Sequence, residues 1–127
     1  MKQLAPQPVL DKLLKDNLAE LAQKEDLSPQ TIEDAVRNGS MVLLANPVHK
    51  DVIPTLVGQP SSIKVNANLG TSPFINDPAK EMLKLAEAHK AGADAVMDLS
   101  TGGDLDAIRR EMLDACPLPL GTVPIYG

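Results

Sequence analysis

Residues 93–103 read ADAVMDLSTGG, and this stretch decides the expected fold. Its apolar run, Ala93–Leu99, has the length and composition of a strand. Two hydroxyl residues and two glycines follow, and an amphipathic helical pattern then extends from about residue 104 to 115. A strand, a glycine-rich turn and a helix in this order indicate one βα unit of a parallel sheet.

The sequence around this unit repeats the same pattern. Residues 63–70 form another strand-like run, and the Asp77-Pro78 signature starts a predicted helix that ends at about Lys90. Residues 118–126 supply one more strand-like run, interrupted by Pro119 and Pro124. We therefore predict an α/β fold with a parallel sheet.

The ends of the three predicted strands are evenly spaced. Asn68, Met97 and Tyr126 follow one another at equal intervals along the chain. A constant βα repeat favours a (β/α)8 barrel over a doubly wound sheet, whose crossovers vary more in length. We expect residues 61–127 to form the first three βα units of such a barrel, incomplete as given.

Residues 1–60 are expected to form a separate segment of helices or a small α/β unit. A leucine-rich amphipathic helix is predicted at residues 9–24 and a second one at 29–37, with Ser28 as its N-cap. A strand is predicted at 41–45. A loop then follows through Pro54, Gly58 and Pro60.

Composition and charge exclude several classes of protein. Hydrophobic residues make up 43% of the 127 residues and charged residues 23%, a globular balance. The net charge of −5, with one Phe, one Tyr and no Trp, argues against nucleic-acid binding, which needs positive grooves and aromatic faces. Because no signal peptide or membrane span is evident, we expect a cytoplasmic protein with no membrane partner.

The carboxyl edge of the predicted sheet is the expected location of a site, because parallel α/β sheets bind ligands there. Residues 66–70, 97–103 and 122–126 lie at this edge and offer amides, hydroxyls, one carboxylate and one phenol. The 100–103 turn can present backbone N–H groups to an anion. Alternatively, Ser100 or Thr101 caps the following helix and the glycines only permit the turn.

Five individual residues can have either a structural or a functional role. An Asp98 that points into the barrel is costly unless it is paired or hydrogen-bonded, although it can also point outward. Met97 by itself is most simply a core residue, and His49 and His89 lack partners at metal-ligand spacing. Cys116 is the single cysteine, so it excludes an internal disulfide and a self-contained thiolate metal site, and it is best interpreted as a small buried hydrophobic residue.

Three motifs resemble one family. The stretches VNANLG at 65–70, GADAVMDLSTG at 92–102 and GTVPIY at 121–126 are similar, in order and spacing, to the N-terminal part of the phosphomethylpyrimidine synthase (ThiC) family. The resemblance implies a radical S-adenosylmethionine enzyme of thiamine biosynthesis. The resemblance further implies conversion of aminoimidazole ribotide to hydroxymethylpyrimidine phosphate. It also implies a (β/α)8 barrel preceded by a smaller domain and followed by a cysteine motif that binds a [4Fe-4S] cluster.

The resemblance also implies which residues bind the substrate. The positions that contact the ribotide in the family correspond here to Asn68, Met97 and Tyr126; no catalytic residue and no metal ligand is assigned. The cluster cysteines of the family lie beyond the segment matched here. We therefore expect a fragment or truncated relative that binds neither S-adenosylmethionine nor a cluster by itself and is inactive alone.

The expected partners are the small-molecule ribotide and either the remainder of the synthase or further copies of the chain, because three strands leave two sheet edges unpaired. Two alternatives stay open. One is a fragment of the related hydroxybenzimidazole synthase of anaerobic cobamide biosynthesis. The other is a non-catalytic module that binds the ribotide or another protein.

Overall fold

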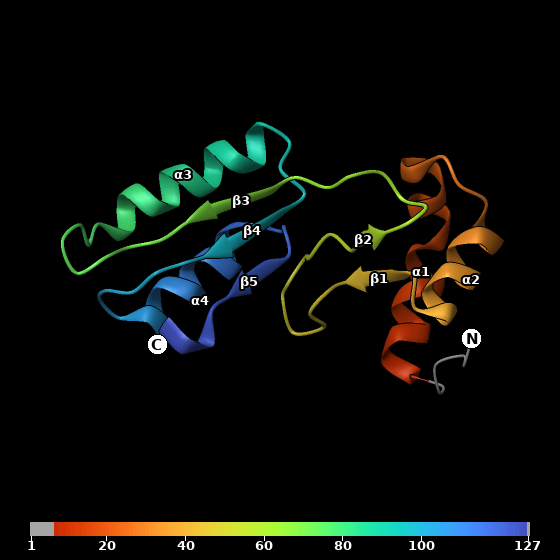
Figure 1. Cartoon of the computed structure of the whole chain (residues 1–127). Coiled ribbons are helices and arrows are strands. Elements are labelled where there is room, and N and C mark those ends of the chain that lie inside the picture. Colours follow the sequence, from red (N-terminus) through yellow and green to blue (C-terminus); the bar gives the residue numbers. More distant parts are fainter. Residues whose placement is uncertain (1–6, 127) are drawn as a thin grey trace. The chain divides into compact units, whose positions relative to one another are not determined.

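The computed structural model describes residues 7–126 and divides into two compact units (Figure 1). Unit 1 comprises residues 7–47 and Pro54–Ile63, and unit 2 comprises Val48–Ile53 and residues 64–126. Residues 1–6 of the expected N-terminal segment, and Gly127 of the expected barrel segment, lie outside the described residues.

Unit 1 contains two helices and a two-stranded sheet. Its elements are α1 (Pro8–Glu25), α2 (Pro29–Asn38), β1 (Met41–Leu44) and β2 (Thr55–Gly58). Both helices start within one residue of their predicted starts, because Pro occupies the first turn of each. The predicted cap of α2 is confirmed: the Ser28 hydroxyl accepts a hydrogen bond from the Thr31 amide at 3.1 Å.

The predicted loop between residues 46 and 60 is wrong in part, because Thr55–Gly58 forms β2. This strand pairs antiparallel with β1, and Val42 lies opposite Val57. The short run between Pro54 and Pro60 carries no alternation of its own that would identify a strand. Its pairing comes from cross-strand contacts, which a local pattern does not contain.

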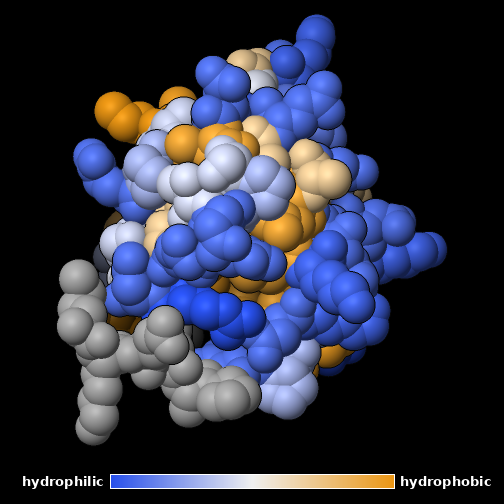
Figure 2. Space-filling model, turned by 90° about the vertical axis from the view of Figure 1, so that its right-hand side faces the viewer, coloured by the Kyte–Doolittle hydropathy of each residue, from blue (hydrophilic) through white to orange (hydrophobic). Residues whose placement is uncertain are grey.

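The core of unit 1 lies between its helices and its sheet. The buried residues are Leu14, Leu21, Ile32, Ala35, Val36, Met41 and Leu56. Figure 2 shows hydrophobic atoms gathered between hydrophilic ones on the face that it views. In the described part of the chain, no helix combines the length and the hydropathy needed to span a membrane.

Unit 2 is a parallel α/β unit. Strands β3 (Asn66–Leu69), β4 (Ala95–Asp98) and β5 (Leu120–Thr122) form a parallel sheet in that order. Helix α3 (Pro78–Lys90) connects β3 to β4, and α4 (Leu105–Ala115) connects β4 to β5 (Figure 1). The α/β fold is therefore confirmed, while the three strands form an open sheet rather than a closed barrel.

The predicted third strand is wrong in its position. In the parallel register Asn68 pairs with Met97, as the equal spacing predicts, but Met97 pairs with Gly121 rather than with Tyr126. Tyr126 lies beyond β5 in a 3-10 helix, Pro124–Tyr126. Pro124 has no backbone N–H to donate to a strand, so the strand ends before it. The equal spacing in the sequence is thus not a constant structural repeat.

The core of unit 2 lies between the sheet and its two helices. The buried residues are Leu69, Leu85, Val96, Ile108, Met112, Cys116 and Leu118. The segment Val48–Ile53 also belongs to this unit, and the Ile53 amide donates to the Pro117 carbonyl at 2.8 Å.

Candidate functional site

The two faces of β3 and β4 have different environments at their carboxyl ends. Side chains alternate along a strand, and in β4 Val96 and Asp98 are buried, with 2% and 0% of their surface exposed. Val96 packs with Leu85 of α3 and Ile108 of α4, so this face is covered by helices. The next residue along, Met97, therefore projects from the opposite face, away from α3 and α4.

Asn68 and Met97 lie side by side on this uncovered face. They are register partners in β3 and β4, with Asn68 exposed and Met97 half-buried. The Asn66 side chain donates to Asn68 Oδ1 at 2.9 Å. A Cβ atom at Gly121 would lie 2.8 Å from Met97 Sδ, so the glycine in β5 leaves space for the thioether. The structure thus brings together two of the three predicted site residues.

Tyr126 does not share this register. It follows the end of β5, and 47% of its surface is exposed. Its backbone amide donates to the Val123 carbonyl at 3.0 Å, which closes the turn of the 3-10 helix. Tyr126 therefore belongs to the loop region after the sheet rather than to the row formed by Asn68 and Met97.

Asp98 points to the helix-covered face and is fully paired there. Its Oδ1 accepts hydrogen bonds from the amide and the hydroxyl of Ser100, the amide at 3.0 Å. Its Oδ2 accepts a hydrogen bond from Nε of Arg109, in α4, at 3.0 Å. The sequence left open whether Asp98 points into a barrel or outward. It points outward, toward the helices, and it is nevertheless buried and paired, with Arg109 as its partner.

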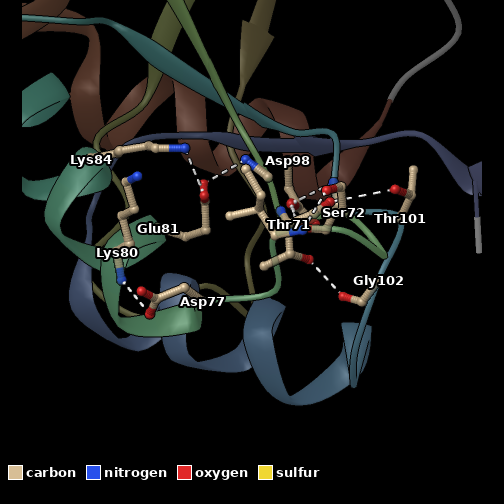
Figure 3. Close-up of polar contacts among 12 residues, drawn as sticks. Thr71, Ser72, Asp77, Lys80, Glu81, Lys84, Asp98, Thr101 and Gly102 are labelled. Carbon is tan, nitrogen blue, oxygen red and sulfur yellow. Dashed lines mark hydrogen bonds and ion pairs between the residues drawn. The ribbon is translucent and has the colours of Figure 1, made fainter.

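Hydrogen bonds around Thr71 join the loop after β3 to the loop after β4 (Figure 3). The Thr71 amide donates to the Ser100 hydroxyl oxygen at 3.0 Å, and the Thr101 amide donates to the Thr71 carbonyl at 2.9 Å. The Thr71 hydroxyl donates to the Gly102 carbonyl at 2.6 Å. The two loops are therefore fixed to each other through both main chain and side chains.

A second buried carboxylate holds the end of β3. Glu81, in the first turn of α3, is 3% exposed, and its Oε2 accepts a hydrogen bond from the Gly70 amide at 2.7 Å (Figure 3). Its Oε1 pairs with Nζ of Lys84 at 2.7 Å. Sequence reasoning missed both Glu81 and Arg109. An acid in a first turn usually serves the helix dipole, and Arg109 merely borders the buried stripe of α4, so neither position is distinctive.

The structure contradicts the capping interpretation of the 100–103 turn, and it gives partners to two of the backbone N–H groups that the anion interpretation invokes. The N-cap of α4 is Asp104, whose Oδ1 accepts from the Ala107 amide at 3.0 Å, so Ser100 and Thr101 do not cap the helix. The amides of Ser100 and Thr101 already donate to Asp98 and Thr71. They are therefore not available to an anion.

The histidines and the cysteine have structural surroundings. His49 is 6% exposed, and its Nε2 lies 2.8 Å from the Cys116 carbonyl oxygen. Cys116 is buried in the core of unit 2, as predicted, whereas His89 is exposed on α3. Within residues 7–126 no three His, Cys, Asp or Glu side chains gather in an arrangement that could hold a metal ion.

Comparison with known proteins identifies the family. Residues 8–127 match the model of the radical SAM ThiC family. The chain belongs to this family. It is 46% identical over 114 residues to the phosphomethylpyrimidine synthase of Pyrococcus abyssi, an alignment that covers 90% of this chain and 27% of that protein.

Two bacterial members of the family are similarly close. The phosphomethylpyrimidine synthases of Thermoanaerobacter sp. and Desulforamulus reducens are each 48% identical over 106 residues, which is 84% of this chain and 24% of each relative. The chain thus spans about a quarter of the length of the ThiC relatives it matches.

The name of the ThiC family implies S-adenosylmethionine and an iron–sulfur cluster in its full-length members. A [4Fe-4S] cluster is held by cysteine thiolates. This chain has one cysteine, Cys116, whose side chain is packed in the core of unit 2. The donor set of the described residues does not fit a cluster.

Proposed function

We propose that this chain supplies part of the ribotide-binding face of a phosphomethylpyrimidine synthase, which converts aminoimidazole ribotide to hydroxymethylpyrimidine phosphate. One observation carries the proposal: three relatives with that name are 46% to 48% identical over most of the chain. On this proposal, Asn68, Met97 and Tyr126 contact the ribotide, and the cluster and S-adenosylmethionine are bound by other parts of the enzyme.

The chemistry of the uncovered face supports this proposal. A ribotide combines a flat, polar heterocycle with a sugar phosphate. The Asn68 amide can donate and accept hydrogen bonds, and the adjacent Met97 thioether is suited to contact with an aromatic ring. The Tyr126 phenol can add a hydrogen bond or a ring contact from the loop after β5.

The same face supports the proposal that β3, β4 and β5 begin a (β/α)8 barrel. Helices cover only one face of the parallel sheet, as in a barrel whose helices form the outer ring. The other face carries the polar Asn68 near the carboxyl end of β3. Barrel enzymes hold their substrates at that end, so further strands would enclose this side chain beside a ligand.

Calorimetric titration with aminoimidazole ribotide tests the proposal on the protein that carries this sequence in its complete reading frame. We expect Asn68→Ala and Met97→Ala each to raise the ribotide Kd by about tenfold, the loss of one good contact. Asn17→Ala in α1 is the matched control, since Asn17 only donates to the Leu13 carbonyl at 2.8 Å. Unchanged heats for Asn68→Ala would remove Asn68 from the site.

Product analysis then separates the enzyme classes. With a reductant and S-adenosylmethionine, the protein is expected to release hydroxymethylpyrimidine phosphate. Formation of hydroxybenzimidazole instead would identify the related cobamide-pathway synthase. Binding of the ribotide without any product would identify a non-catalytic binding module.

A further inference from the structure

We propose that Asp98, Ser100 and Arg109 form a positioning device that holds the Met97 side chain in place for the ribotide without touching the ribotide. The inference rests on the proposed function for the identity of the ligand. Its first part, that these three residues fix Met97, concerns the protein alone and can be tested without a ligand.

The first step is the adjacency of Met97 and Asp98 in β4. Because strand side chains alternate, fixing the Asp98 side chain on the helix face also fixes the direction of Met97 on the other face. Asp98 is fully buried, and both of its oxygens accept hydrogen bonds, from Ser100 on one side and from Arg109 at 3.0 Å on the other. These hydrogen bonds restrict rotation of the Asp98 carboxylate.

The second step is the connection to Asn68. The Ser100 hydroxyl donates to Asp98 and accepts from the Thr71 amide at 3.0 Å. Thr71 lies shortly after Asn68 in the chain, and Asn68 is the register partner of Met97. The same hydroxyl therefore couples the end of β3 to the end of β4 and sets the relative position of the two ligand-facing side chains.

The third step concerns the Arg109–Asp98 ion pair, whose burial costs free energy. A buried ion pair is often no more stabilising than hydrophobic residues of the same size. Arg109 gives only Nε to Asp98, and its Nη2 atom is buried without a hydrogen-bond partner among residues 7–126, which costs free energy. Retaining a costly charge pair directly behind Met97 points to a positioning role.

The test compares Asp98→Asn with Asp94→Asn. Asp94 is a matched control because it precedes the same strand and accepts a hydrogen bond from the Val65 amide at 2.8 Å, at the amino end of the same strand pair. The readout is the methyl resonance of Met97 in protein labelled at its methionine methyl groups with carbon-13, assigned with Met97→Leu. A second readout is the ribotide Kd.

We expect Asp98→Asn to shift or broaden the Met97 resonance and to raise the ribotide Kd at least tenfold, while Asp94→Asn leaves both unchanged. An unshifted Met97 resonance in Asp98→Asn overturns the inference whether or not the ribotide binds. A shifted resonance in a protein that never binds the ribotide supports the positioning of Met97 and overturns the proposed function.

A second variant keeps the test decisive if Asp98→Asn fails to fold. Arg109→Met preserves the length and packing of the side chain but removes the donor to Asp98. In the folded protein it should move the Met97 resonance in the same direction and weaken ribotide binding severalfold. A Met97 resonance identical to that of the unmodified protein would overturn the inference independently.

Discussion

Replacing Ser100 with Ala tests the buried hydrogen bonds at the carboxyl edge of the sheet. The Ser100 side chain is 0% exposed, and its hydroxyl makes two hydrogen bonds. It donates to the Asp98 carboxylate and accepts from the Thr71 amide at 3.0 Å. The substitution removes both bonds and leaves the Thr71 amide buried without this partner.

The expected loss of stability follows from these two contacts. A hydrogen bond to a charged group contributes about 1.5 to 3 kcal/mol, and a buried donor left without a partner costs about 1 to 3 kcal/mol. Asp98 keeps its bonds from the Ser100 amide and from Arg109, so its charge stays compensated. We therefore expect a decrease of about 3 kcal/mol in the free energy of unfolding.

Urea denaturation measures this free energy, and amide hydrogen exchange at Thr71 measures the local effect. Ser72→Ala is the matched control, because the Ser72 hydroxyl accepts a 3.0 Å bond from the Ile75 amide in the same loop but in contact with solvent. The control should lose less than about 1 kcal/mol, since water can replace that bond. A loss for Ser100→Ala that is no larger than for Ser72→Ala would refute the reasoning.

Two further substitutions address the ligand face and a helix end. Gly121→Ala places a methyl group 2.8 Å from Met97 Sδ. The flexible thioether should therefore move, which raises the ribotide Kd about tenfold, while urea denaturation detects less than about 1 kcal/mol of destabilisation. An unchanged Kd would show that Met97 does not contact the ribotide. Ser28→Ala removes the 3.1 Å bond to the Thr31 amide and should cost about 1 kcal/mol in the same assay, and a loss too small to detect would show that this cap does not stabilise α2.

The helices of this chain were predictable because residues close in sequence determine where each helix begins. Asp77 illustrates this: its side chain accepts from the Lys80 amide at 3.1 Å, and Pro78 occupies the first turn of α3. Both features act within one turn of the chain. A local window of sequence therefore contains all the information that sets such a boundary.

The strands were less predictable because their pairing depends on distant residues. The β2 strand exists because Thr55–Gly58 pairs with β1. The β5 strand pairs with β4 from Leu120 to Thr122 and ends before Pro124. The equal interval was correct for Asn68 and Met97 but accidental for Tyr126. A repeated spacing in sequence cannot distinguish register from coincidence when the connecting helices differ in length.

The sequence predicts a location for the candidate site but not its supporting contacts. The rule that ligands bind at the carboxyl edge of parallel strands identified Asn68 and Met97 as candidates. It gave no information on Glu81 or Arg109, since the partner of a buried carboxylate depends on how a helix packs against the sheet. Such partners are determined by the tertiary structure, which buries one acid or arginine beside a particular hydrogen-bonding group.

Close backbone packing explains Gly102 in the ADAVMDLSTGG stretch and Gly70 in the loop after β3. A Cβ atom at Gly102 would lie 2.6 Å from the carbonyl carbon of Ser72, and one at Gly70 would lie 2.6 Å from the backbone of Leu99 and Ser100. At both glycines the main chain of one loop therefore contacts the main chain of the other loop, so closely that a side chain would not fit between them. That approach brings the Thr71 amide within reach of Ser100. A side chain at either glycine would push the loops apart and break the hydrogen bond from the Thr71 amide to the Ser100 hydroxyl.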